Sequence, residues 1–170
     1  MIRLTSQELA AGRRAMAEAR PRIEKLKIED EELEAYLLRI VTRLEALIDH
    51  PPMGSGARIL RRALEVFLPI LELDWVPAEP RYLSELPAED QARIEKLRQE
   101  RRLMAFQNSS VPPGDDRYKL ALIDLLVESL AIFILYSHRK AEHRCLAMLM
   151  DLLEKETPTK SVPAAKVWVS

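Results

Sequence analysis

The sequence is short of the residues that many sheet-based and cofactor-binding folds require. Its 170 residues include four glycines and one cysteine, and aromatic residues make up 5% of the chain. Scarce glycine and scarce aromatic residues argue against a β-sandwich, a β-barrel and a Rossmann sheet, and favour helices. The single cysteine, Cys145, excludes an intrachain disulfide and a multi-cysteine zinc site.

Neither sign of charge dominates the sequence. The chain has 26 Lys and Arg residues and 27 Asp and Glu residues, which gives a formal net charge of −1. The chain therefore lacks the strongly basic field of a typical nucleic-acid-binding protein, and only local basic patches remain as candidates. The most apolar run, residues 120–136, contains Asp124 and Glu128, and two carboxylates near its middle are costly in lipid. With no signal-like apolar stretch at the start, we expect a cytoplasmic protein that does not contact membranes.

Apolar residues recur with a helical period. The clearest stripe has spacings of four and three, which predicts one amphipathic helix: Leu33, Leu37, Ile40, Leu44 and Leu47. Further helices are expected near the N-terminus, after residue 56 and over about 88–106. From 117 to about 156 there is no Pro or Gly. These patterns predict an all-α fold, an irregular bundle of about five helices with a long C-terminal helix.

We expect residues 1–156 to form a single α-helical domain and residues 157–170 to form an extended or flexible tail. A continuous helix over 117–156 would be about 60 Å long, more than a compact domain of this size usually holds. It either breaks near Ser137 and His138 or projects towards a partner. Contact with a protein partner or self-association is therefore expected, with these candidate side chains: Leu146, Leu149, Met150, Leu153 and Trp168.

Motifs for metal binding and nucleophilic catalysis are missing. No histidine has a glutamate three residues before it, as a di-iron bundle requires, and no phosphate-binding glycine loop or nucleophile-elbow motif occurs. His138, Glu142 and Cys145 are ligand types on one helix face, but three ligands on one helix rarely enclose an ion. We predict no metal and no cofactor, with this trio as a remote alternative.

Asp124 and Glu128 are four residues apart on the most apolar segment, so they share a helix face. Paired carboxylates perform acid–base chemistry when burial raises the pKa of one of them. More often they bind an arginine from a neighbouring helix or form the wet side of their own helix.

Arginines gather where a helix is expected to begin. Arg58, Arg61 and Arg62 follow Gly54-Ser55-Gly56, and cations at a helix N-terminus oppose the helix dipole. A bound phosphate would relieve this conflict. Acidic side chains from a neighbouring helix, such as those of residues 29–34, would do so equally well.

Two further basic clusters are candidates for binding anions or nucleic-acid phosphates: Arg98, Arg101 and Arg102 in one, and Arg139, Lys140 and Arg144 in the other. The first ends a helix, where cations suit the dipole. The second has His138 and His143 beside it.

The residues carry no resemblance to a known family. We expect a non-enzymatic α-helical subunit or adaptor of a larger macromolecular assembly, with nucleic-acid phosphates contacted through the Arg clusters as a subsidiary hypothesis. The alternative is a small helical enzyme or ligand-binding bundle that uses buried carboxylates.

Overall fold

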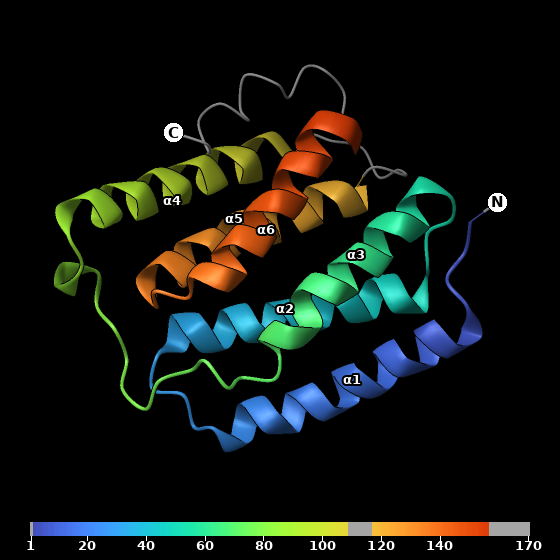
Figure 1. The fold of residues 1–170 in the computed structure, drawn as a ribbon, viewed down its shortest axis with the longest axis horizontal. Coiled ribbons are helices and arrows are strands. Elements are labelled where there is room, and N and C mark those ends of the chain that lie inside the picture. The colour runs from blue at the N-terminus through green and yellow to red at the C-terminus, as the bar shows by residue number, and fades with distance from the viewer. Residues whose placement is uncertain (1, 109–116, 157–170) are drawn as a thin grey trace. The chain divides into compact units, whose positions relative to one another are not determined.

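The computed structural model describes residues 2–108 and 117–156, and every regular element in these residues is helical (Figure 1). The all-α prediction is confirmed. Six α-helices occur in the described residues, compared with the five or so expected. The predicted tail 157–170, with Trp168, lies outside them.

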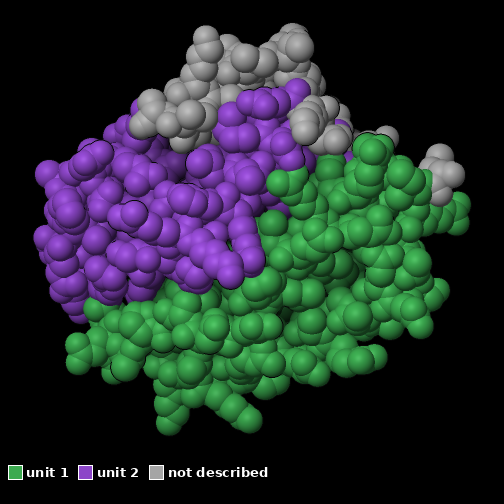
Figure 2. Space-filling view, in the orientation of Figure 1, with its two compact units in different colours: residues 1–80 green, residues 81–170 purple. Residues whose placement is uncertain are grey.

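The chain divides into two compact units, Met1–Pro80 and Arg81–Ser170, which Figure 2 shows in green and purple. Unit 1 holds α1 (Ser6–Lys25), α2 (Glu31–Asp49) and α3 (Ser55–Ile70). Unit 2 holds a short 3₁₀ turn η1 (Leu83–Glu85), α4 (Ala88–Asn108), α5 (Arg117–Leu135), α6 (Arg139–Asp151) and a final π-helical turn η2 (Leu152–Glu156). The single α-helical domain expected over residues 1–156 stays a prediction.

Unit 1 is built on an antiparallel pair, α1 and α2 (Figure 1). Thr5 begins α1 with a capping box, because its hydroxyl accepts from the Glu8 amide while the Glu8 carboxylate accepts from the Thr5 amide. Asp30 caps α2 with its side chain, which accepts from the amides of Glu32 and Leu33. A Cβ at Gly12 of α1 would lie 2.9 Å from Cδ1 of Ile48, so the two helices pack closely there and a larger side chain would require the end of the Ile48 side chain to move. The predicted α2 stripe is buried: Leu33, Leu37, Ile40, Val41, Leu44 and Ile48.

Unit 2 is built around α5, which packs against both α4 and α6. Every residue from Leu125 to Leu135 is buried, so this helix is enclosed on all sides in its second half. Figure 1 shows α5 running back along α4 and α6 running back along α5. The exposed side of α6 therefore points away from α5.

The long C-terminal helix predicted from 117 is instead two helices, α5 and α6, joined over Tyr136, Ser137 and His138. Ser137 adopts a left-handed conformation with φ 56°. Its amide donates to the Ile134 carbonyl, and the His138 amide donates to the Phe133 carbonyl. These two bonds form a Schellman motif, which ends a helix without proline and here without glycine. Of the two alternatives left open by the sequence, the structure shows the break near Ser137 and His138, and residues 117–156 do not form one continuous helix of about 60 Å.

The contact between His138 and Phe133 completes this helix end. The two rings meet edge to face with centroids 5.4 Å apart. A side-chain contact between these two positions commonly accompanies the Schellman motif. The imidazole therefore has a structural role at the turn between α5 and α6.

Candidate functional site

The two carboxylates of α5 bind one arginine from α4. Arg101 donates from Nε to Oδ1 of Asp124 at 2.9 Å and from Nη2 to Oδ2 at 3.4 Å. Its Nη1 lies 3.1 Å from Oε2 of Glu128. The side chains of Asp124 and Glu128 are 15% and 7% exposed, and that of Arg101 is 31% exposed.

This cluster confirms the ion-pair interpretation of Asp124 and Glu128, in which an arginine from a neighbouring helix binds both. One guanidinium bridges both carboxylates and so fastens α4 to α5. Arg101 was a candidate for anion binding from the sequence, but in the structure its guanidinium binds the carboxylates of Asp124 and Glu128. Of its neighbours in that cluster, Arg98 lies 3.6 Å from Glu95 on the same helix, and Arg102 is exposed.

The arginines at the start of α3 are not equivalent. Arg61 forms a two-point ion pair with Glu8 of α1, with Nε–Oε2 at 2.7 Å and Nη2–Oε1 at 3.0 Å. The hydrogen bond from Arg61, helped by the Thr5 amide, lowers the pKa of Glu8 to about 2. Arg62 is half-buried and Arg58 is exposed. Arg61 is therefore paired with a carboxylate of this chain, which is one of the two possibilities that the sequence left open; the other was a bound anion.

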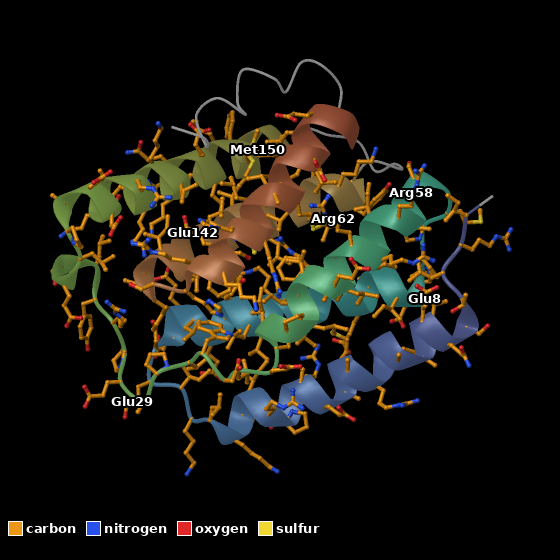
Figure 3. All side chains as sticks on the ribbon, in the orientation of Figure 1. Glu8, Glu29, Arg58, Arg62, Glu142 and Met150 are labelled. Carbon is orange, nitrogen blue, oxygen red and sulfur yellow. The ribbon has the colours of Figure 1, made fainter. Side chains whose placement is uncertain are left out.

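The partner of Arg61 differs from the one suggested by sequence. Glu29 lies in the connection that follows α1, whereas Glu8 lies at the start of that helix (Figure 3). A helix of the length of α1 spans about 30 Å, which separates the two ends widely. Arg58 and Arg62 on α3 are labelled near the Glu8 end in the same view. The acidic stretch 29–34 therefore does not supply the partner of Arg61.

In the described part of the chain, His138, Glu142 and Cys145 are not arranged as a metal-binding group. Cys145 is fully buried, and burial raises the pKa of its thiol to about 12. Glu142 accepts a hydrogen bond from Nη2 of Arg93 at 2.8 Å. Across residues 2–108 and 117–156, no group of three His, Cys, Asp or Glu side chains is arranged to hold a metal ion.

The exposed face of α6 carries only basic side chains over its first two turns. Arg139, Lys140, His143 and Arg144 are all exposed, and we call these four residues the basic face of α6. None of the four forms an ion pair or hydrogen bond through its side chain with another described residue. The acid of this segment, Glu142, is only 12% exposed and binds Arg93 (its place near the start of α6 is labelled in Figure 3).

The inner face of α6 contributes to the core. Leu149 and Leu153 are 0% and 3% exposed, so these two candidates for partner contact are already packed within this chain. Leu146 and Met150 are half-buried and retain some surface. The apolar stripe seen in the sequence is therefore mainly the side of α6 and η2 that faces inward.

Two residues of these ion pairs were not candidates from sequence. Glu8 was recognisable as a helix-capping residue, but its second role depends on how α3 approaches α1. Arg93 gave no signal, because it is one of several charges on a polar helix. Glu8 is separated from Arg61 by 53 residues along the chain, and Arg93 is separated from Glu142 by 49 residues.

Comparison with protein-family models, curated proteins and solved structures found no match to this chain. Within the described residues, none of the helices is both long enough and apolar enough to cross a membrane.

Proposed function

We propose that this chain is a non-enzymatic α-helical subunit or adaptor that contacts the phosphates of a nucleic acid through the basic face of α6. One observation carries the proposal. Arg139, Lys140, His143 and Arg144 share an exposed face and have no acidic partner among the described residues. Most surface charges in a neutral protein are interspersed with charges of the other sign, so a face of one sign favours an external polyanion.

The position of this face on the helix adds support. Arg139 and Lys140 lie in the first turn of α6, where the unfavourable interaction of each cation with the helix dipole costs roughly a few tenths of a kcal/mol. His138, the N-cap residue of α6, makes no side-chain capping hydrogen bond. A phosphate bound here relieves the repulsion and gains from the dipole.

The residue types predict how the nucleic acid is recognised. Arg139 and Arg144 are able to contact phosphate oxygens in a bidentate manner, and Lys140 acts as a point charge. Such contacts position a nucleic-acid backbone but do not read bases. We therefore expect binding that depends little on sequence and strongly on salt.

The alternative function, a helical enzyme or ligand-binding bundle that uses Asp124 and Glu128, has less support. Arg101 already engages both carboxylates, which favours a structural ion cluster over a general acid or base.

A charge-neutralising variant tests the proposal. Arg139→Gln, Lys140→Gln and Arg144→Gln are combined in one protein, and binding to a fluorescent single-stranded oligonucleotide is measured by anisotropy at low salt. We expect affinity to fall about tenfold or more, since three phosphate contacts are lost.

The matched control removes three positive charges elsewhere, with Arg3→Gln, Arg14→Gln and Lys25→Gln. These side chains are exposed in unit 1, and none forms a side-chain ion pair or hydrogen bond with a described residue. The control should bind almost as tightly as the unmodified chain. Equal losses in the two triple variants, or no binding by the unmodified chain at low salt, would contradict the proposal.

A further inference from the structure

Arg93 of α4 holds the acidic residue that interrupts the basic sequence of α6. Glu142 is the only acid among residues 139–144. Nη2 of Arg93 lies 2.8 Å from Oε2 of Glu142, and the Glu142 side chain is 12% exposed while that of Arg93 is 45% exposed. Arg93 also lies 3.7 Å from Asp90 one turn earlier on α4, which helps to fix its position. The carboxylate therefore faces α4 and not the exposed face of α6.

Without Arg93, Glu142 has another partner within reach. Side chains three and four residues apart on a helix are neighbours, and Arg139 lies three residues before Glu142. A carboxylate released from α4 would pair with Arg139 and neutralise one of the three permanent cations of the basic face. The acid would also repel a phosphate bound to the remaining cations.

We propose that Arg93 is a positioning residue for the basic face of α6: by binding Glu142 from α4, it leaves Arg139, Lys140 and Arg144 available to phosphates. This inference rests on the proposed function, because it concerns the same surface. Arg93 acts through Glu142 and needs no contact with the nucleic acid. Its effect on binding must therefore depend on whether residue 142 carries a charge.

A double-mutant cycle tests that dependence, using Arg93→Gln, Glu142→Gln and the two substitutions together. Affinity for a fluorescent single-stranded oligonucleotide is measured at low salt, and circular dichroism confirms that each variant folds. With Glu142 present, we expect Arg93→Gln to weaken binding about two- to fivefold, the size of one lost surface charge contact. With Gln at position 142, the same substitution should leave the affinity nearly unchanged.

Lys96→Gln is the matched control, because Lys96 is an exposed cation of the same helix. Its effect should be equal in the two backgrounds. If Arg93→Gln also weakens binding equally in both backgrounds, Arg93 is an ordinary surface charge and this inference is overturned while the proposed function stands. If the unmodified chain does not bind at all, the proposed function fails and this inference fails with it.

Discussion

The thiol of Cys145 is enclosed by the core on the inner face of α6. Burial disfavours the thiolate and raises the pKa to about 12, although a hydrogen bond with Ser129 partly offsets the shift. Because the thiolate is the reactive form, we expect native Cys145 to react very slowly with a disulfide reagent such as DTNB at pH 8. In urea the same thiol should react within minutes. Rapid and complete labelling of the folded chain would contradict the buried position.

Glu8 links helix capping to an ion pair with Arg61, and this combination predicts a dependence of stability on pH. Its folded pKa of about 2 lies below the ordinary value of 4.5. The ion pair therefore stabilises the folded chain above about pH 4.5, and the stabilisation is lost as the pH falls from 4.5 towards 2. Glu8→Gln keeps a capping residue but removes the charge.

Urea unfolding at several pH values measures this effect. Glu8→Gln should lower the unfolding midpoint at pH 7, and its difference from the unmodified chain should shrink as the pH approaches 2. Glu24→Gln, an exposed position on the same helix, should change the midpoint little at either pH. A Glu8→Gln difference that is constant across this range would rule out the ion pair as its cause.

At the scale of the helical element, Ser137 occupies a position that suits glycine. At its φ of 56°, a residue with a side chain has a conformational free energy roughly 1 kcal/mol higher than that of glycine. We expect Ser137→Gly to stabilise the chain by up to about 1 kcal/mol and Ser137→Val, which is β-branched, to destabilise it by at least as much. Thermal unfolding measures both. Stabilisation by valine would show that α5 and α6 do not join through this left-handed turn.

The contact between α4 and α5 depends on Arg101. Its removal leaves two carboxylates with little exposure, so we expect Arg101→Met to cost about 2–4 kcal/mol of unfolding free energy, allowing for the partial exposure of the guanidinium. Arg98→Met, on the same helix, should cost less than about 1 kcal/mol, because its partner at 3.6 Å, Glu95, has a side chain that is 50% exposed and is not left buried without a counter-charge. Adding Glu128→Gln to Arg101→Met should recover part of the loss. No recovery would mean that packing, not charge, explains the effect.

Local patterns predicted the helices well but not the partners of their charged side chains. The spacing of Asp124 and Glu128 was enough to place them on one face and to anticipate an arginine partner. The choice of Arg101 over Arg98 or Arg102 depends on the rotation of α4 against α5, which short-range spacing does not encode. The end of α5 was anticipated near Ser137 and His138 only as one of two alternatives, on grounds of helix length, because its left-handed residue is a serine and no glycine marks the position.

For the whole chain, the net charge of −1 conceals how charge is distributed. Of the basic clusters identified from sequence, Arg61 and Arg101 are engaged by carboxylates within their own units, whereas Arg139, Lys140 and Arg144 have none among the described residues. From the sequence, all of these basic residues were candidates for binding anions. Which of them pair with a carboxylate on another helix can be seen only in the three-dimensional structure. Arg58 and Arg102 are exposed as well, but each belongs to a cluster in which another arginine is bound to a carboxylate, so the cluster on α6 is the strongest candidate surface in the described residues.

The salt dependence of binding tests the role of α6 most directly. If Arg139, Lys140 and Arg144 each engage one phosphate of a single strand, the logarithm of the association constant should fall with the logarithm of salt concentration with a slope of about 2 in magnitude. In the triple variant of these residues, the slope should fall close to zero. A slope that is the same in both proteins would contradict phosphate binding by the basic face of α6.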